Sequence, residues 1–509
     1  MTSLRDTLHT LIQQGVVYQI SLALFAGWLL PFAFAPYDAW WCAPLSVYLF
    51  LRRICLVKQL KLAAWCGWFY GLGAFGAGVS WVFVSIHDYG GAGLVLALVL
   101  TSLFVMGLAL LPALQAVLAW RYLRHSRALY LGWAGLWVLF EWLRSHLLTG
   151  FPWLLLGTSQ AETLLGAWLP VGGVFLVSFW LALSAYVMHV IFTRQWAKKP
   201  VYLGLVLLPW LGAWGLQQVT WSTPSGEPLA VSLIQANIPQ LEKWLPEQRM
   251  QSLKLYYQMT AKETQAEVII WPETAVPALY QNAQGYLNQV QEGALAAQAT
   301  LITGIPFRTH PEQNQYHNTL IVVGEGAGVY HKQKLVPFGE YVPLEAWLRG
   351  LIQFFDLPMS SFIAGPSEQA PLRVQGHQVA PLICYEAVYP DFAAQQIRST
   401  DWILMVSNDT WFGGSIGPWQ HLQIAQVRAR EHARMLVRAT NNGVSVILDP
   451  QGGIVVQGEQ FAQTVIRGQV QAYQGETPFS RFGSLPTGVL ALFALAYALF
   501  TPKTQARLF

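Results

Sequence analysis

Long apolar runs constrain the fold of this chain more than any other feature. A helix needs about 20 mostly apolar residues to cross the hydrocarbon core of a membrane. Such runs lie at 16–36, 39–51, 62–86, 91–120, 128–148, 163–193, 200–217 and 485–502, the second of them being short. They predict an α-helical transmembrane domain of seven spans at 1–217, and an eighth span with a cytoplasmic tail at 485–509.

The composition agrees with a membrane protein that has one soluble part. Hydrophobic residues make up 54% of the 509 residues and charged residues only 11%, and the mean hydropathy is +0.37. The net charge of +4 is modest, and the basic residues lie at the ends of the apolar runs. They therefore indicate membrane topology, and we expect no binding of nucleic acid.

Basic residues occur in alternate linkers between the predicted spans. They are Arg52, Arg53, Lys58, Lys61, Arg121, Arg124, Arg127, Arg194, Lys198, Lys199, Lys503 and Arg507. The other linkers, including 87–88 and 149–152, have almost no positive charge. Because linkers rich in lysine and arginine stay in the cytoplasm, both termini are expected there and the segment 218–484 on the far side. In a bacterium this describes a multi-pass protein of the inner membrane with a periplasmic domain.

The segment 218–484 alternates between strand-like and helix-like stretches. Strand-like runs lie at Leu229–Gln235, Glu267–Trp271, Thr300–Thr303, Thr319–Val323, Val379–Cys384, Trp402–Ser407, Val444–Leu448 and Ile454–Val456. Pro246–Lys262 is amphipathic and begins with a proline, and Leu287–Ala297 also has helical character. This alternation predicts an α/β domain with layered sheets.

Two glycine patterns do not indicate nucleotide binding. The run 71–76 matches GxGxxG, but it lies inside an apolar span with no preceding strand and predicts a helix-packing face. The run 324–328 separates two short strand patterns and predicts a hairpin turn. Cys42, Cys55 and Cys66 lie in or beside apolar spans, so no disulfide framework is expected. We expect no metal ion and no other cofactor.

Three residues with the chemistry of acyl transfer stand at the ends of strand-like runs. They are Glu273, Lys332 and Cys384, the last being the only cysteine of 218–484. A thiolate is a strong nucleophile, an ammonium beside it stabilises a tetrahedral oxyanion, and a carboxylate moves the thiol proton. Alone, each has an ordinary explanation as a surface glutamate, a surface lysine or an inert thiol, and the strand pattern does not separate Lys332 from Lys334. Together they predict thiol-based acyl transfer.

Four motifs in this segment resemble those of one known family. They are Trp271-Pro272-Glu273-Thr274, Lys332 with the run Leu335–Pro343, Ile383-Cys384-Tyr385-Glu386, and the run Ser407–Gly413. These motifs look like those of apolipoprotein N-acyltransferase, a membrane branch of the nitrilase (carbon–nitrogen hydrolase) superfamily. The resemblance covers the whole chain, and it implies that 218–484 folds as a nitrilase-like αββα sandwich.

The resemblance also implies a role for individual residues. Glu273 matches the general base, Cys384 the acylated nucleophile and Lys332 the oxyanion-stabilising lysine, because the spacing Tyr-x-Lys-x-x-Leu-Val-Pro selects Lys332 over Lys334. The residues that match supporting or substrate-binding positions of the family are Trp244, Glu340, Tyr385 and Glu386.

The reaction implied by the resemblance is a ping-pong acyl transfer between lipids. Cys384 takes the sn-1 acyl chain of a phospholipid, preferably phosphatidylethanolamine. The free amine of a diacylglyceryl-cysteine apolipoprotein then attacks the thioester and becomes acylated. We expect a monomer whose partners are these two substrates and the membrane lipid around them.

An apolar stretch follows the lysine motif. Its residues are Trp347, Leu348, Leu351, Ile352, Phe354, Phe355, Leu357, Met359 and Phe362. We interpret it as a mobile lid that dips into the membrane and admits acyl chains, with a buried amphipathic helix as the alternative. The run 411–414 is expected to form another membrane-side loop. The charged residues from Arg428 to Arg438 are expected to form a structural ion-pair network, with a phosphate contact as the alternative.

Three other functions agree with parts of the sequence. A membrane-anchored hydrolase of amides or nitriles needs the same glutamate, lysine and cysteine, but the full set of spans and the apolar lid argue against it. A non-catalytic membrane scaffold predicts the loss of at least one of these residues, and none is lost. A transporter places ionisable groups along its spans, whereas the spans here contain few beyond Glu141 and Arg144.

Overall fold

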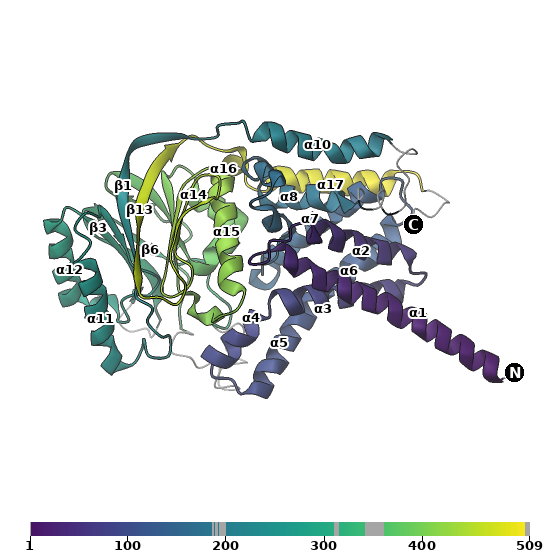
Figure 1. Cartoon of the computed structure of the whole chain (residues 1–509), viewed down its shortest axis with the longest axis horizontal. Helices are drawn as coiled ribbons and strands as arrows, with labels where there is room; N and C mark the ends of the chain where they lie inside the picture. Colours follow the sequence, from purple (N-terminus) through teal and green to yellow (C-terminus); the bar gives the residue numbers. More distant parts are fainter. Residues whose placement is uncertain are drawn as a thin grey trace. The chain divides into compact units, whose positions relative to one another are not determined.

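The chain folds into two compact units in the computed structural model (Figure 1). One unit, called here the helical unit, comprises Met1–Val82, Val95–Val219 and Ser484–Phe509. The other, the α/β unit, comprises Phe83–Leu94 and Thr220–Gly483. The structure describes residues 2–185, 188, 192, 200–309, 315–341 and 361–503.

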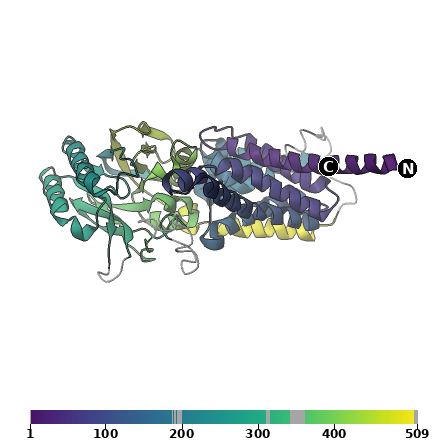
Figure 2. The ribbon, with the colours of Figure 1, turned by 90° about the horizontal axis from the view of Figure 1, so that it is seen from below.

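The helical unit consists of long apolar helices that run alongside one another (Figure 2). Its helices are α1 (Thr2–Leu29), α2 (Cys42–Leu56), α3 (Leu60–Gly78), α4 (Trp81–Val84, extending into the other unit), α5 (Leu94–Leu108), α6 (Leu110–Leu118), α7 (Leu129–His146), α8 (Leu169–Leu183), α10 (Pro200–Leu216) and α17 (Leu485–Phe500). Although α17 is the last helix of the chain, it belongs to this unit: the Ser126 hydroxyl donates to the Ala498 carbonyl at 2.6 Å, and the Thr487 hydroxyl to the Gly172 carbonyl at 2.9 Å.

Part of the described helical unit is long and apolar enough to cross a membrane. Three helical stretches meet this criterion, Gly15–Ala33, Leu94–Leu123 and Leu164–Leu183, and the bent pair Leu60–Gly78 with Trp81–Tyr89 makes up to four. The bend between the members of that pair is 56°. Two further apolar helices, Leu207–Leu216 and Leu485–Phe500, are shorter than the criterion requires. The count of eight spans therefore stays a prediction.

The glycine pattern at 71–76 serves helix packing, which confirms the sequence interpretation. A Cβ on Gly73 would lie 2.3 Å from the Leu24 carbonyl of α1, and one on Gly71 would lie 2.6 Å from Cα of Ala109. Side chains at these two positions would separate the helices, so glycine permits the close backbone contact.

Thirteen strands are found in the described part of the α/β unit. They are β1 (Thr223–Gln235), β2 (Val268–Ile270), β3 (Thr300–Phe307), β4 (His317–Gly324), β5 (Gly326–Ala327), β6 (Val329–His331), β7 (Leu372–Val374), β8 (His377–Ile383), β9 (Trp402–Ser407), β10 (Leu436–Thr440), β11 (Val446–Leu448), β12 (Ile454–Gln457) and β13 (Thr464–Gln474). They form one sheet of order β13-β1-β2-β3-β4-β6 and a second of order β12-β11-β10-β9-β8-β7-β5. Each sheet has a parallel centre, made by β1, β2 and β3 in the first and by β8, β9 and β10 in the second.

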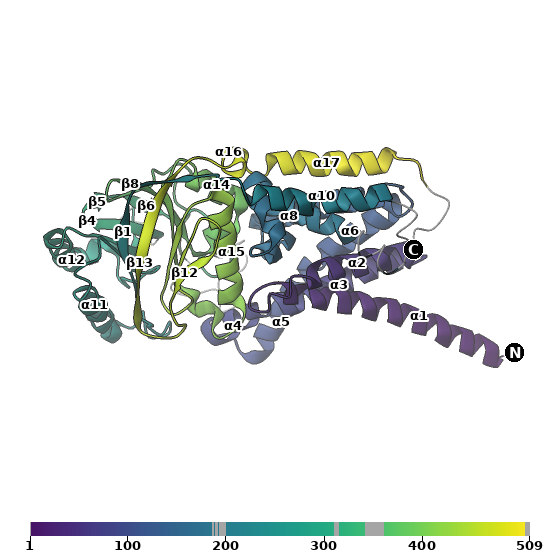
Figure 3. The same cartoon turned by 45° about the horizontal axis from the view of Figure 1, so that its top comes forward.

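Helices cover the outer faces of the two sheets (Figures 1 and 3). The first sheet carries α11 (Pro246–Thr260) and α12 (Gln284–Ala296), and the second carries α14 (Pro390–Ile397) and α15 (Gly417–His432). The short α16 (Pro478–Phe482) follows the last strand. One face of the second sheet packs on the first sheet and the other is covered by helices, so every residue of the central strand β9 is buried, and all but the last, Ser407, are apolar.

Two hydrophobic clusters join these layers. Between the sheets, Leu233 and Ile270 of the first sheet share one buried cluster with Leu404 and Val437 of the second. Outside the first sheet, a second cluster includes Tyr256 of α11 and joins that helix to the sheet. The layers are therefore helix, sheet, sheet and helix, which confirms the αββα sandwich expected from the family resemblance.

Candidate active site

Three strand ends carry the three residues that the sequence predicts to be catalytic. Glu273 follows β2, Lys332 follows β6 and Cys384 follows β8. The first two strands lie in one sheet and β8 lies in the other, so the site forms where the two sheets come together. Lys332 is fixed in register with β4, because its backbone N–H donates to the Asn318 carbonyl at 2.8 Å.

Lys332 lies between two buried carboxylates. Its Nζ is 3.2 Å from Glu273 Oε1 and 2.9 Å from Glu340 Oε1. The lysine side chain is only 1% exposed, and the two glutamate side chains are 8% and 9% exposed. Burial alone would lower the pKa of Lys332, but the charges of Glu273 and Glu340 raise it well above its ordinary value. Lys332 is therefore a fixed ammonium across the physiological pH range.

The Cys384 thiol interacts with this charged cluster. Burial raises its pKa far above the ordinary value, and the negative charge of Glu273 raises it further. Lys332 and a hydrogen bond with the Ser407 hydroxyl oppose this shift without cancelling it. The resting thiol is therefore protonated, and to act as a nucleophile it would need a base to accept its proton.

Glu340 reaches Lys332 because the loop before it is tightly closed. Its backbone N–H donates to the Val336 carbonyl at 2.9 Å, and its Oε2 accepts from the Val336 N–H at 2.8 Å. The other carboxylate oxygen, Oε1, is thereby directed at Lys332. The Leu335–Pro343 motif thus supplies a second carboxylate to the cluster.

Glu386 connects the loops that carry the lysine and the cysteine. Its Oε1 accepts from the Tyr330 hydroxyl at 2.9 Å and from the Gln333 N–H at 2.6 Å, and its Oε2 accepts from the Ile383 N–H at 2.7 Å. Burial raises the pKa of this carboxyl group to about 7, although these donors favour the ionised form. Glu386 therefore holds the end of β6 and the end of β8 together.

The structure separates Lys332 from Lys334, which the strand pattern could not do. Lys334 Nζ lies over two aromatic rings, 5.5 Å from the centroid of Tyr389 and 5.7 Å from that of Phe392. Lys332, by contrast, contacts both carboxylates. The geometry therefore agrees with the choice made from the motif spacing.

Asn318 of β4 is a site residue that the sequence analysis missed. Its Nδ2 donates to Glu273 Oε1 at 2.7 Å and to Glu340 Oε1 at 2.9 Å, the same two oxygens that Lys332 contacts. Both neighbours are acceptors, so the amide must present its nitrogen to them. One signal was available: Asn318 is a polar residue directly before the predicted strand Thr319–Val323, close to a strand end like the other three.

Replacing Asn318 with alanine is expected to slow acyl transfer about 10-fold, because each carboxylate loses a buried hydrogen bond worth roughly 1–3 kcal/mol. Single-turnover acylation of the protein by a phospholipid measures this. Thr319→Ala is the matched control: its hydroxyl contacts the His331 ring at 2.8 Å, and its side chain points to the other face of β4. Equal rates for the two variants would contradict the role of Asn318.

Trp244 and Tyr385, predicted as supporting residues, are the neighbours in sequence of Lys243 and Cys384. Trp244 is half-buried, and its indole N–H is buried with no partner among the described residues. The ring of Tyr385 packs against Tyr389, with the centroids 5.3 Å apart.

Lys243, the neighbour of Trp244, is a second buried lysine beside Glu273. Its Nζ donates to the Thr274 hydroxyl at 2.8 Å and to the Glu273 carbonyl at 3.3 Å. Burial lowers the pKa of Lys243 from 10.5 to about 8, although the charge of Glu273 opposes the shift. These two bonds fasten the segment that carries Trp244 to the turn that contains Glu273 and Thr274.

The lowered pKa of Lys243 predicts a pH-dependent stability. Between pH 8 and 10.5 the folded protein binds fewer protons at this position than the unfolded chain does, so its stability rises with pH across that window. We expect the Tm of the wild type, relative to that of Lys243→Met, to increase on the order of 5 °C from pH 8 to 10. Thermal unfolding at several pH values measures this difference, and a constant difference would show that Lys243 has an ordinary pKa.

Most of the predicted lid, including Trp347, Phe354 and Met359, lies outside the described residues. Its last member, Phe362, is buried, and its backbone N–H donates to the Glu340 carbonyl at 3.0 Å. Tyr341 and Ser361 pair across the base of the segment. The last residue of the predicted lid is therefore fastened beside Glu340.

The charged stretch from Arg428 to Arg438 forms buried ion pairs, as expected. Arg428 pairs with Glu431 at 3.0 Å, and Arg438 pairs with Asp409 at 2.5 Å. Trp411, predicted to lie in a membrane-side loop, contacts the segment Phe83–Leu94: its carbonyl accepts from the Ser85 hydroxyl at 2.8 Å. These residues hold the α/β unit together internally.

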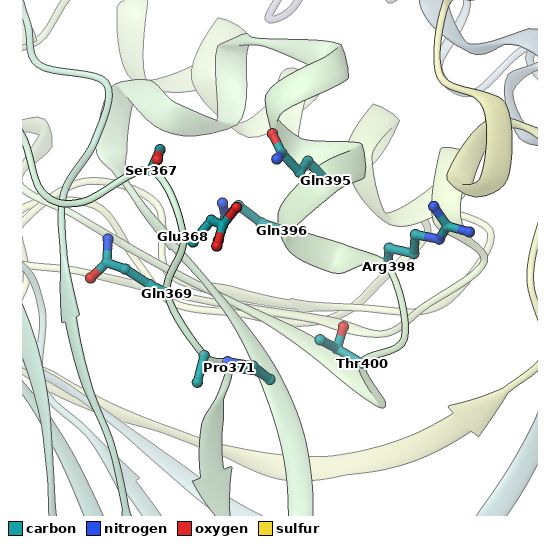
Figure 4. A pocket seen from close by; sticks show the side chains of 9 residues that line it. Ser367, Glu368, Gln369, Pro371, Gln395, Gln396, Arg398 and Thr400 are labelled. Carbon is teal, nitrogen blue, oxygen red and sulfur yellow. The ribbon is translucent and has the colours of Figure 1, made fainter.

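An open hollow in the surface of the α/β unit is separate from the cluster. Its volume is about 410 Å³, and its lining includes Glu368, Gln369, Arg398 and Thr400 (Figure 4). None of the predicted site residues lines it. The hollow is therefore not the candidate active site.

Comparison with known families agrees with both units. Residues 26–187 match the family model described as the apolipoprotein N-acyltransferase N-terminal domain. Residues 230–479 match the carbon–nitrogen hydrolase model. The second match covers the glutamate, the lysine and the cysteine of the cluster.

Curated relatives match nearly the full length of the chain. A protein of Pseudomonas aeruginosa is 49% identical over 502 residues, covering 96% of this chain and 97% of its own length. Proteins of Pseudomonas syringae (46% over 492 residues, 95% and 96%) and Coxiella burnetii (38% over 479 residues, 93% and 98%) are also similar. All three are named apolipoprotein N-acyltransferase.

Among solved structures, Saccharomyces cerevisiae Nit3, a nitrilase-superfamily protein, is similar at 15% identity and a TM-score of 0.37, over 49% of this chain and 93% of Nit3. The assignment rests on the sequence relatives, whose identities of 38–49% extend over almost all of both chains. This chain therefore belongs to the apolipoprotein N-acyltransferase family, enzymes of the carbon–nitrogen hydrolase superfamily that acylate lipoproteins.

Proposed function

We propose that this enzyme moves an sn-1 acyl chain from phosphatidylethanolamine, through a thioester on Cys384, to the N-terminal amine of a diacylglyceryl-cysteine apolipoprotein. One observation carries the proposal: an ammonium, Lys332, is held between Glu273 and Glu340 beside a protonated thiol. Such a cluster contains the nucleophile, the base and the oxyanion partner that acyl transfer requires.

The first half-reaction forms the thioester. Glu273 accepts the Sγ proton, and the Cys384 thiolate attacks the carbonyl carbon of the phospholipid ester. The carbonyl oxygen becomes an oxyanion that the Lys332 ammonium stabilises. When the C–O bond breaks, Glu273 returns the proton to the departing oxygen and the lysophospholipid leaves. Cys384 now carries the acyl chain.

The second half-reaction uses the same residues in reverse order. The neutral amine of the apolipoprotein attacks the thioester carbon, and Lys332 again faces the oxyanion. Glu273 takes a proton from the attacking nitrogen and delivers it to the departing sulfur. The products are an N-acylated lipoprotein and the free thiol of Cys384.

The location of both substrates agrees with the proposed topology. A donor and an acceptor that are anchored in lipid call for a catalyst at the membrane surface. We therefore propose seven spans at 1–217, a periplasmic catalytic domain at 218–484 and a final span at 485–509, with both termini cytoplasmic in a bacterial inner membrane. The enzyme is proposed to act as a monomer, and the segment from Trp347 to Phe362 is proposed to admit the acyl chains.

Labelled substrates test this function. The enzyme is incubated with phosphatidylethanolamine that is isotopically labelled in its sn-1 chain and with a diacylated lipopeptide. The expected products are labelled triacylated lipopeptide and lysophospholipid. Double-reciprocal plots of initial rate against donor concentration, at several lipopeptide concentrations, should be parallel, as ping-pong kinetics require. Labelled free fatty acid without acylated lipopeptide would instead favour the alternative, a membrane-anchored hydrolase that uses water as acceptor.

A further inference from the structure

A chain of buried polar residues lies behind the nucleophile, and the proposed mechanism does not use it. It consists of His421 of α15, Asp409 after β9 and Arg438 of β10. His421 and Arg438 are 0% exposed and Asp409 is 1% exposed. Burying three polar groups of this kind is unfavourable unless each is paired. Their hydrogen-bond partners therefore indicate which part of the site these three residues hold in place.

The contacts of His421 lead directly to the nucleophile. Its Nε2 lies 3.2 Å from the backbone carbonyl oxygen of Cys384, and its Nδ1 lies 3.1 Å from Asp409 Oδ1. A carbonyl oxygen only accepts hydrogen bonds, so Nε2 must carry a proton and donate it. Arg438 Nη2 flanks the same ring, 3.2 Å from Nδ1.

Asp409 is held as a carboxylate. Its Oδ2 accepts from Arg438 Nη2 at 2.5 Å, and its Oδ1 accepts from the Ser407 hydroxyl at 2.7 Å. Burial alone would raise the pKa of Asp409, but the charge of Arg438 holds it well below its usual range. Through the His421 ring, the Asp409 carboxylate is thus linked to the main chain of Cys384.

The backbone of Cys384 needs such support. Its φ is +53°, the left-handed region that residues other than glycine seldom adopt. Strain of this kind persists only where the surroundings fix the conformation. Here the residue before Cys384 is held by Glu386, since the Ile383 N–H donates to that carboxylate, and the Cys384 carbonyl itself is held by His421.

We propose that His421 is a positioning residue for the nucleophile. Its Nε2–H holds the Cys384 carbonyl, Asp409 and Arg438 hold the ring, and Sγ is thereby kept in the orientation from which it reacts. This inference deepens the proposed function and rests on Cys384 being the acylated residue. It assigns His421 an effect on the reaction rate and none on the affinity for the donor.

Two substitutions of His421 separate the contact with Cys384 from mere packing. The side-chain nitrogen of His421→Gln reaches about as far as Nε2, so it replaces the donor to the Cys384 carbonyl. The nitrogen of His421→Asn reaches only as far as Nδ1, so it serves Asp409 and leaves the carbonyl without its partner. The matched controls are His432→Gln and His432→Asn, because His432 is a buried histidine of the same helix whose Nδ1 contacts Ser480 at 2.7 Å.

Two rates are measured per folded molecule: single-turnover acylation by phosphatidylethanolamine at several concentrations, and alkylation of Cys384 by iodoacetamide. We expect His421→Asn to lose about 10- to 100-fold in both rates with an unchanged half-saturating phospholipid concentration. His421→Gln should stay within about 3-fold of the wild type, and the two His432 variants should react alike.

Equal rates for His421→Asn and His421→Gln would overturn the proposal. If His421→Asn does not fold, His421→Met replaces it as the variant without a donor. If neither of them folds while His421→Gln does, His421 contributes to stability alone, and this result would also overturn the proposal. The alkylation rate needs no lipid. If the wild type takes up no acyl chain, the proposed function fails, and alkylation still decides the role of His421.

Discussion

Replacing Lys332 with methionine is expected to lower the rate of Cys384 acylation by about 10³-fold. In the proposed mechanism the lysine supplies the ammonium that faces the oxyanion in both half-reactions, and loss of one such donor typically reduces catalysis by 10²–10³. The substitution also leaves Glu273 and Glu340 without the cation that lies 3.2 Å and 2.9 Å from them. Two buried carboxylates then face each other, which places this effect at the upper end of that range.

Lys334→Met is the matched control for this substitution. Lys334 is two residues away, and its ammonium lies over the rings of Tyr389 and Phe392 instead of between the carboxylates. Its removal is expected to change the acylation rate by less than about 3-fold, because such a cation–π contact contributes only roughly 0.5–1 kcal/mol. Single-turnover acylation of both variants, with a thermal unfolding curve for each, gives the comparison. More than a tenth of the wild-type rate in Lys332→Met would contradict the oxyanion role.

Replacing Glu273 with glutamine is expected to lower acyl transfer by about 10²–10⁴-fold. Glutamine has nearly the same shape but does not accept the thiol proton, and the Cys384 thiol is protonated at rest because its pKa is raised. The Asn408 N–H, which donates to Glu273 Oε2 at 2.8 Å, retains an acceptor if the amide oxygen faces it. The amide nitrogen of the glutamine then faces the donors Lys332 and Asn318, so the variant also loses stability, and its rate of thioester formation is compared per folded molecule.

The control for Glu273→Gln is Glu263→Gln in the same unit. Glu263 is also buried, and it pairs with Arg467 at 2.6 Å, away from the cluster. Its substitution should affect thermal stability more than rate. If Glu273→Gln forms the thioester as fast as Glu263→Gln, another group must take the thiol proton, and the mechanism proposed above would be wrong.

The sequence predicts residues that meet in the candidate site because they stand at strand ends. The predicted run Glu267–Trp271 contains β2 (Val268–Ile270), and the run Val379–Cys384 contains most of β8 (His377–Ile383). Strands rich in valine and isoleucine are recognisable when both faces are buried, and the polar residue after each one is then conspicuous. Asn318 escapes this reasoning, because it lies before its predicted strand and not after it.

Other site residues depend on contacts between distant parts of the chain. Lys243 meets Thr274 across 31 positions of sequence, and His421 meets Cys384 across 37. Neither residue belongs to a local pattern that distinguishes a buried functional side chain from a solvent-exposed one. Such residues become identifiable only once the sheets and helices are packed.

Hydropathy predicts where the helices lie better than it predicts their limits. The run expected at 128–148 agrees with α7 (Leu129–His146), and the one expected at 91–120 agrees with the helical stretch Leu94–Leu123. The segment Phe83–Leu94, read in part as membrane span, groups with the α/β unit. This segment contacts the α/β unit through hydrogen bonds such as the one from the Ser85 hydroxyl to the Trp411 carbonyl. An apolar sequence pattern does not predict such long-range hydrogen bonds.

Intact-protein mass spectrometry tests the central claim most directly. The purified enzyme and a Cys384→Ala variant are each incubated with phosphatidylethanolamine and weighed before and after addition of a diacylated lipopeptide. The account predicts a mass increase of one fatty acyl group in the wild type, its absence in the variant, and its discharge by the lipopeptide. An enzyme that acylates the lipopeptide without ever carrying an acyl group, or that carries one equally well without Cys384, would contradict the thioester mechanism.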